Sequence, residues 1–341
     1  MAEKIRIGFV DFWKGFDARN NCLTDMLIRI YGKNRIEVVD KNFDYLFFSC
    51  FGHSNLKYDC IKIFFTGENI VPDFNICDYA IGVHEMNFGD RYLRLPFYYW
   101  YDNAYERAVQ KHKFKDSYYL NRKFCCFVIS NSLADSNRQK MISLLNAYKQ
   151  LDGGGKFMNN VGGPVRDKYS FVSNYKFSLC FENSKAEGYT TEKILEGFAG
   201  NSVPIYWGNP GIIQEFNEKS FINCNAYGSL EEAVEFIKEV DKDDELYLRF
   251  VKEPVFGKES TGKKEITEKN LEFFFRNIFG QNISLAGRVN RVGMGERYLR
   301  QMALLRPVYT FCSALLRMYA FCENRKRLKA KLHNKYMLWR K

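Results

Sequence analysis

FSLCFENSKAEGYTTEKILEGFAGNSVPIYWGNP, residues 177–210, is the stretch that decides the fold class. It opens with an apolar run, 177–181, that is typical of a buried strand. Polar residues follow, and the letters TTEK at 190–193 are typical of a helix start. The helix leads into a second apolar run, 202–207, and the turn GNPG. A strand, a helix and a strand in this order predict a βαβ unit with parallel strands.

The same alternation occurs in both halves of the chain. In the first half, strands are predicted at 4–10, 35–39, 45–48, 62–65 and 78–83, with a helix at 23–31. After a polar stretch the pattern restarts with a strand at 123–129 and a helix at 138–151. We therefore predict an α/β protein with two Rossmann-like domains, residues 1–122 and 123–284, facing a cleft that holds the active site. Residues 285–341 are predicted to form a basic helical tail.

The positive charge is concentrated in this tail. The 341 residues carry a net charge of +11, and 286–341 contain fourteen Lys and Arg against two Glu. A neutral body with a basic tail indicates an attachment device rather than a nucleic-acid-binding domain. The segment from Arg325 to Lys341 interleaves basic residues with Leu, Tyr and Trp, which suits an anionic membrane surface. The alternative is a solvated helix that docks on the body.

The cysteine pattern and the N-terminal sequence indicate in which cellular compartment the protein is expected. Ten cysteines are scattered without a C-x-x-C pair, and four histidines are too dispersed for a zinc pattern. This favours a reducing compartment over a disulfide scaffold. The chain enters a strand without a signal-peptide pattern, and no apolar run reaches the roughly 18 residues of a membrane span. Asp241-Lys242-Asp243 has the letters of a D-x-D metal motif, but its place at a helix end favours a solvated turn, so no metal site is predicted.

The helix start at 190–193 suits an anionic ligand with a sugar beside it. Free N–H groups at a helix N-terminus bind phosphate, and Lys193 adds a charge suited to a diphosphate. Glu192 cannot bind phosphate, but it can accept hydrogen bonds from sugar hydroxyls. A nucleotide sugar explains this combination better than a nucleotide alone. An ordinary capped helix after a polar loop remains the alternative.

Other candidate site residues follow predicted strands or open predicted helices. Glu68 follows the strand 62–65 and is a candidate general base, with Glu85 and Asp73 as competitors that local chemistry does not exclude. Arg138 opens the helix after 130–137, where a solvated helix residue is the alternative. Phe12 and Trp13 could stack on a sugar face, although a core position is the usual place for a single aromatic residue.

The two longest motifs resemble one enzyme family. Residues 177–210 resemble the donor-site signature of α-1,3-fucosyltransferases, glycosyltransferase family 10. FTGENIVPDFNICDYAIGVHEMNFGDRYLRLPFYY, 65–99, resembles their N-terminal half. The likeness is strongest to bacterial members, including the Helicobacter enzymes that build Lewis-type antigens. It implies a GT-B architecture, with GDP-β-L-fucose as donor and inversion to an α-linked product. No cofactor is implied, and stimulation by a divalent metal stays open.

The resemblance also assigns roles. It implies that Glu68 is the base that takes the proton from the acceptor hydroxyl, and that Glu192 holds the sugar or its ribose and favours the oxocarbenium-like transition state. Donor binding is implied for Arg138, Glu182, Asn183, Tyr189, Glu192 and Lys193. The N-terminal domain would hold the acceptor, a LacNAc-type glycan or glycolipid, with Phe12, Trp13 and Glu85 as expected contacts.

The resemblance also leaves alternatives. The heptad repeats that follow the catalytic body in Helicobacter enzymes are absent from this sequence, so the oligomeric state is left open. The expected location is the bacterial cytoplasm, peripheral on the inner face of the cytoplasmic membrane, in surface-glycan or lipopolysaccharide synthesis. The rival functions are another GT-B nucleotide-sugar transferase and, further away, a basic-tailed nucleic-acid-binding protein.

Overall fold

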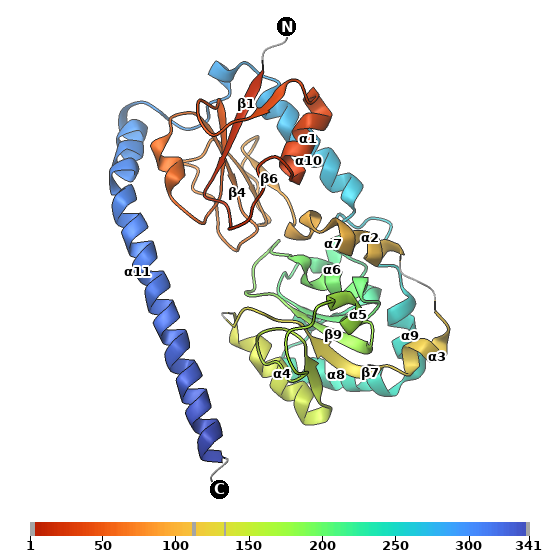
Figure 1. Cartoon of the computed structure of the whole chain (residues 1–341). Coiled ribbons are helices and arrows are strands. Elements are labelled where there is room, and N and C mark those ends of the chain that lie inside the picture. The colour runs from red at the N-terminus through yellow and green to blue at the C-terminus, as the bar shows by residue number, and fades with distance from the viewer. Residues whose placement is uncertain (1–3, 111–113, 133, 339–341) are drawn as a thin grey trace.

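Two parallel β-sheets, each with helices around it, form the body of the protein (Figure 1). The structure is a computed structural model that describes residues 4–110, 114–132 and 134–338, with side chains described through 319 except at 317. Each sheet belongs to one half of the chain, and all named strand pairs are parallel. The predicted α/β class with two Rossmann-like domains is confirmed.

The first domain contains a sheet with the order β2-β1-β3-β4-β5-β6. Its elements are β1 (Ile5–Val10), α1 (Cys22–Tyr31), β2 (Ile36–Val38), β3 (Tyr45–Phe48), η1 (Ser54–Lys57), β4 (Ile61–Phe65), β5 (Tyr79–Gly82), β6 (Tyr92–Arg94) and η2 (Phe97–Trp100). Every residue of β3, β4 and β5 is buried. These strands are almost entirely apolar, with Lys62 of β4 as the exception, because both faces of the sheet are covered, which is why they could be predicted.

The second domain contains a sheet with the order β11-β10-β9-β7-β8. Its elements are α2 (Asp102–Gln110), α3 (Asp116–Leu120), β7 (Lys123–Phe127), α4 (Ser136–Tyr148), β8 (Leu151–Gly153), α5 (Lys168–Val172), β9 (Tyr175–Phe181), α6 (Glu192–Ala199), β10 (Val203–Trp207), α7 (Ile212–Glu215), η3 (Glu218–Ser220), β11 (Ile222–Asn223), η4 (Cys224–Ala226), α8 (Leu230–Lys242) and α9 (Asp244–Lys252). The central strand β9 is buried throughout and pairs with β7 and β10.

The chain returns to the first domain after α9. Helix α10 (Lys264–Phe279) packs its apolar face, which includes Leu271 and Phe275, against the first sheet beside Ile7 and Phe47. The predicted boundaries place α10 in the second domain and α2 and α3 in the first, and the packing corrects both, since Ala104 and Ala108 of α2 and Tyr119 of α3 belong to clusters of the second domain. An amphipathic pattern reveals that a helix has a buried face, but it does not reveal which sheet that face covers.

A buried carboxylate fixes the segment after α10 and η5 (Ile283–Leu285) to the first domain. Asp78 is fully buried and accepts hydrogen bonds from both terminal nitrogens of Arg291, 2.9 Å each. It also accepts the N–H groups of Arg288 and Val289. Burial alone would raise the pKa of Asp78, but these bonds outweigh it and lower the pKa below its ordinary value.

The C-terminal segment is one long helix, α11 (Gly293–Leu338), that leaves the first domain as a rod (Figure 1). Its 46 residues correspond to about 70 Å. Near its start it contacts the first domain, where Tyr298 donates to Asp73 and His53 lies beside Ser313. The predicted helical tail is confirmed as a helix, whereas the basic side chains between Arg325 and Lys341 lie outside the described side chains. Among the described residues, no helix is long and apolar enough to cross a membrane.

The D-x-D letters at 241–243 are a structural feature. Asp241 is buried, not solvated as predicted, and it accepts hydrogen bonds from Tyr148 (3.0 Å) and Lys149 (2.5 Å). Lys176 lies 3.7 Å from it. This carboxylate therefore joins α8 to the end of α4 and the start of β9.

Candidate active site

The loops at the carboxyl ends of β4, β5 and β9 meet between the two domains. The side chain of Asn69 donates to the Ser184 hydroxyl at 2.7 Å, and the Glu85 N–H donates to the Glu187 carbonyl at 3.2 Å. Ligands of parallel α/β sheets bind at these strand ends. The predicted donor-binding and base-bearing motifs therefore face each other. Here the donor loop denotes residues 182–191 and the base loop residues 66–71.

Glu182 lies beneath the donor loop and holds the start of α6. Its side chain is fully buried and accepts the N–H of Thr191 at 2.8 Å, the Thr191 hydroxyl at 2.6 Å and Lys193 Nζ at 3.1 Å. Gly208 makes room for it, because a Cβ there would lie 2.5 Å from the Glu182 side chain. Glu182 was predicted to touch the donor. Its complete burial instead fits a support for the residues that do.

Lys193 and Glu192 begin α6, and both side chains are 21% exposed. Burial opposes the charge of Lys193, but the carboxylates of Glu182 and Glu192 raise its pKa above the ordinary lysine value. Burial likewise works against ionisation of Glu192, and the charge of Lys193 together with a backbone hydrogen bond lowers its pKa. Both groups are therefore charged at neutral pH and can reach a ligand at the helix N-terminus.

Arg138 joins α4 to the donor loop. It is 2% exposed, so the alternative of a solvated helix residue is wrong. Its Nη2 donates to the Asn183 side chain at 2.6 Å and to the Phe181 carbonyl at 3.2 Å, and Nη1 reaches the Asn131 carbonyl. Its buried Nε has no hydrogen-bond partner among the described residues. Arg138 and Asn183 are thus brought together as predicted.

Tyr189 is 2% exposed and lies in the donor loop next to Gly188. Burial raises its pKa, and the charges of Glu182 and Glu68 contribute in the same direction. The contribution from Glu68 agrees with the hydrogen bond that joins the base loop to the donor loop. Gly188 has φ +79°, and a Cβ there would lie 2.4 Å from the Glu85 nitrogen. Only glycine permits this approach of the two domains.

Glu68 projects from the base loop, where its residue is exposed. Its N–H donates to the Thr66 hydroxyl at 3.0 Å. Gly67 lies against the ring of Phe97, and a Cβ at this position would lie 2.1 Å from that ring. The base candidate therefore stands on a tightly packed turn with its carboxylate outside the packed region.

Two of the predicted acceptor residues, Phe12 and Trp13, lie in an aromatic cluster, and the third, Glu85, forms an ion pair. Phe12 stacks on Phe16 at 4.0 Å between ring centroids, and Trp13 contacts Trp100 edge-on at 5.8 Å. Both are part of an aromatic cluster beyond the end of β1, and both remain partly exposed. Glu85 is 62% exposed and pairs with Arg94 at 3.1 Å.

Sequence reasoning missed a polar network behind the donor loop. Glu215 is 2% exposed, and its Oε1 accepts hydrogen bonds from Arg94 (2.6 Å), Thr190 (2.8 Å) and Asn209 (2.8 Å). Asn209 also accepts the Gly188 N–H at 2.9 Å. The GNPG turn was the available signal, since an asparagine after a buried strand is placed to bond nearby backbone.

No group of three or more His, Cys, Asp or Glu side chains that could hold a metal occurs in the described part of the chain.

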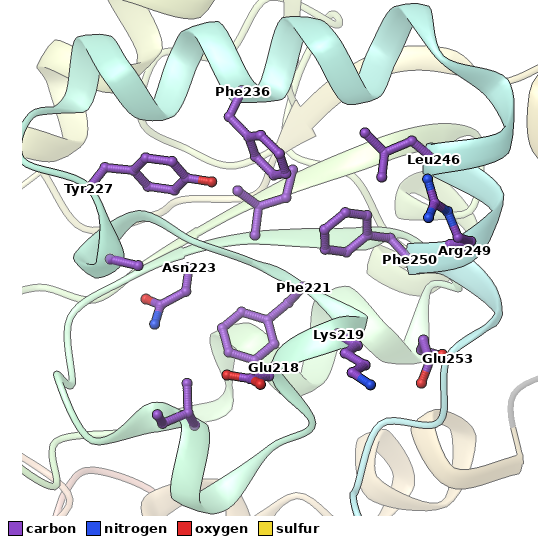
Figure 2. A pocket seen from close by; sticks show the side chains of 13 residues that line it. Glu218, Lys219, Phe221, Asn223, Tyr227, Phe236, Leu246, Arg249, Phe250 and Glu253 are labelled. Carbon is purple, nitrogen blue, oxygen red and sulfur yellow. The ribbon is translucent and has the colours of Figure 1, made fainter.

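A separate cavity of about 680 Å³ lies between α8, α9 and the edge strand β11 (Figure 2). Aromatic side chains surround it, including Phe221, Tyr227, Phe236 and Phe250. None of the predicted site residues lines it.

Family models match both halves of the chain. Residues 7–101 match the "Alpha-(1,3)-fucosyltransferase FucT N-terminal domain", and residues 119–261 match "Glycosyltransferase family 10 (fucosyltransferase) C-term". The sequence is 37% identical over 220 residues to the alpha-(1,3)-fucosyltransferase FucT of Helicobacter pylori, which covers 55% of this chain and 45% of that protein. It is 25% identical over 295 residues to a putative fucosyltransferase of Acanthamoeba polyphaga mimivirus. This match covers 81% of this chain and 47% of the viral protein. The chain thus spans about half the length of these curated relatives.

A solved structure is similar over both domains. The crystal structure of an alpha1,3-fucosyltransferase with GDP-fucose has a TM-score of 0.70 and 30% sequence identity, and it covers 82% of this chain and 91% of its own. This similarity confirms the GT-B architecture expected from the sequence.

Proposed function

Since the chain belongs to glycosyltransferase family 10, the fucosyltransferases, we propose that it transfers L-fucose from GDP-β-L-fucose to the 3-hydroxyl of GlcNAc in a LacNAc-type glycan, with inversion. The observation that carries the proposal is the meeting of the base loop and the donor loop, joined by the Asn69–Ser184 hydrogen bond. The similar protein solved with GDP-fucose supports the identity of the donor.

The donor loop has the chemistry for a diphosphate leaving group. Lys193 and the first N–H groups of α6 are the donors available to phosphate oxygens, and Arg138, which holds Asn183, is a further proposed phosphate contact. Leaving-group stabilisation by fixed positive groups is the main electrostatic task in this transfer. Glu192 stays ionised beside Lys193, where it can accept sugar or ribose hydroxyls and favour positive charge developing on the fucose ring.

Glu68 is the proposed general base. Inversion requires a base on the face of the sugar opposite the leaving group, and Glu68 belongs to the domain opposite the one that carries α6. The acceptor oxygen would bond to C1 of fucose while the C1–O bond to GDP breaks and the hydroxyl proton passes to Glu68. Phe12, Trp13 and Glu85 remain proposed acceptor contacts from the same domain.

The test is donor and acceptor specificity with the purified protein. GDP should be released from GDP-fucose only when LacNAc is present, and linkage analysis of the product should show α-1,3-linked fucose. GDP-mannose and UDP-sugars, offered at the same concentration, separate this function from another transferase with the same fold. Turnover with one of those donors in place of GDP-fucose would contradict the proposal.

For the tail we propose peripheral attachment to an anionic membrane surface. Leu304, Val308, Phe311, Leu315 and Met318 on α11 are between 47% and 78% exposed, although they are large and apolar. Binding to a membrane surface requires apolar side chains that enter the lipid and basic side chains that attract anionic headgroups. These exposed residues and the basic sequence after them provide both. The location is accordingly proposed as the inner face of the bacterial cytoplasmic membrane, in surface-glycan or lipopolysaccharide synthesis.

A truncation after Val292 tests the tail, because it keeps the linker that Asp78 holds. The truncated protein should stay folded and lose sedimentation with phosphatidylserine vesicles, while neither protein sediments with neutral phosphatidylcholine vesicles. Unfolding of the truncated protein would instead show that the contacts of α11 with the first domain are required for its stability, and equal vesicle binding would locate the attachment elsewhere.

A further inference from the structure

The part of the donor loop that holds Tyr189 is fixed from behind by residues of both domains. Arg94, at the end of β6 in the first domain, donates from Nη2 to the Gly188 carbonyl at 2.8 Å and to Glu215 at 2.6 Å. The Phe97 N–H of the first domain also donates to the Thr190 carbonyl at 3.2 Å. The backbone on either side of Tyr189 therefore has partners outside its own domain.

Glu215 and Asn209 complete this arrangement from the second domain. The Asn209 side chain accepts the Gly188 N–H and donates to both Thr190 Oγ1 (2.9 Å) and Glu215 (2.8 Å). Thr190, Asn209 and Glu215 are each at most 2% exposed. Hydrogen bonds to a buried charge are stronger and more directional than those at a surface, so they restrict the loop to one conformation.

We propose that Arg94 and Glu215 are positioning residues for the donor site: their ion pair and its hydrogen bonds hold residues 188–191 in the conformation that receives the nucleotide diphosphate. Donor affinity then depends on a residue of the acceptor-side domain. The inference rests on the proposed function, because it concerns the site proposed for GDP-fucose. Neither residue touches the donor in this account, since both act through the loop.

A purely structural role predicts a different result from a positioning role. If the network only stabilises the fold, its loss reduces the fraction of active protein, which lowers kcat and leaves the donor KM and the GDP dissociation constant unchanged. If it positions the loop, the donor KM and the GDP dissociation constant rise, while the acceptor KM stays the same.

The experiment compares Glu215→Gln with the unmodified full-length protein by GDP titration calorimetry and by steady-state kinetics with GDP-fucose. Glu215→Gln keeps the shape and removes the buried charge that Arg94 faces, while the exposed Glu85 stays beside Arg94. We expect the GDP dissociation constant and the donor KM to rise about tenfold, the size expected for weakening one hydrogen bond to a charged group. The acceptor KM should stay within about twofold, since the lost bonds all lie behind the donor loop.

Lys264→Met is the matched control. Lys264 of α10 in the first domain forms a second ion pair between the domains, 2.7 Å from Asp102 of α2, and has no hydrogen bond to the donor loop among the described residues. This variant should leave GDP binding unchanged. An equal loss of GDP affinity in Lys264→Met would overturn the positioning role, because domain contact alone would then account for the effect.

Thr190→Val decides the question if Glu215→Gln does not fold. It removes only the hydroxyl that donates to Glu215, and it should weaken GDP binding about threefold. Unchanged GDP affinity in the folded variants would overturn the inference. Absence of GDP binding by the unmodified protein is a different result, since it would overturn the proposed function itself.

Discussion

The donor loop and the base loop face each other, but they are built differently. Residues 188–191 of the donor loop are buried, and their backbone and hydroxyl groups are bonded to both domains. In the base loop, residues 68–71 are exposed, and Ile70 and Val71 present apolar side chains to solvent. A fixed geometry suits the donor side, because the negative charge that develops on the diphosphate must be stabilised as the C1–O bond to GDP breaks. A loop with few buried contacts can adjust when an acceptor arrives.

Lys193→Met should give the largest change in stability. It leaves Glu182 fully buried without its cation, and breaking a buried pair in this way costs about 3 kcal/mol. Urea unfolding of both proteins measures the loss, and GDP affinity should fall with it. Lys185→Met, an exposed lysine of the same loop, is the control and should change the free energy of unfolding by less than about 0.5 kcal/mol. Equal stability of the two variants would contradict the buried pairing.

Gly188→Ala should cost less but still disturb the meeting of the domains. A φ of +79° with a side chain costs about 1–3 kcal/mol, and the new Cβ would press on the Glu85 backbone. Differential scanning calorimetry should show a lower Tm. Gly211→Ala is the matched control in the adjacent turn, where the nearest atom lies 3.5 Å from a Cβ and φ is −82°. If the two alanine variants have the same Tm, the close approach of Gly188 to Glu85 does not exist in solution.

Asn69→Ala tests the direct link between the two loops and should have the smallest effect. Its hydrogen bond to Ser184 is exposed, so its loss should cost about 0.5–1 kcal/mol at most. We expect GDP affinity to stay within about twofold, because the donor loop has its other partners. A loss as large as that of Lys193→Met would show that the base loop is part of the donor site.

Hydrogen exchange sharpens the same comparison without mutation. The amides of 68–71 should exchange early, and those of 188–191 should exchange late because opening them breaks several buried hydrogen bonds. Addition of GDP should slow exchange in the donor loop only. Early exchange of both loops would remove the distinction between a fixed and an adjustable side.

Local pattern was sufficient for the inner strands and for the helix start, but it missed the short edge strands β6, β8 and β11, and it did not reveal which distant residues pack around these elements. The buried strands and the TTEK helix start were predicted because burial on both faces and the residue preferences of a helix N-terminus leave marks in consecutive residues, although Thr191 donates its hydroxyl to Glu182 instead of capping the helix. Arg94 and Glu215 are 121 positions apart, and nothing near either residue indicates the other. The burial of Glu182 and Asp241 was missed for the same reason, because a carboxylate is expected at the surface until its distant partners are known.

The most direct test of the account is Glu68→Gln, which keeps the size of the side chain and removes the base. Turnover of GDP-fucose with LacNAc should fall by about 10²–10⁴-fold, the usual contribution of a general base. GDP affinity should be unchanged, because the donor loop is held by other residues. Turnover within about threefold of the unmodified protein would contradict the assignment of Glu68, and a matching loss of GDP affinity would contradict the division between the two loops.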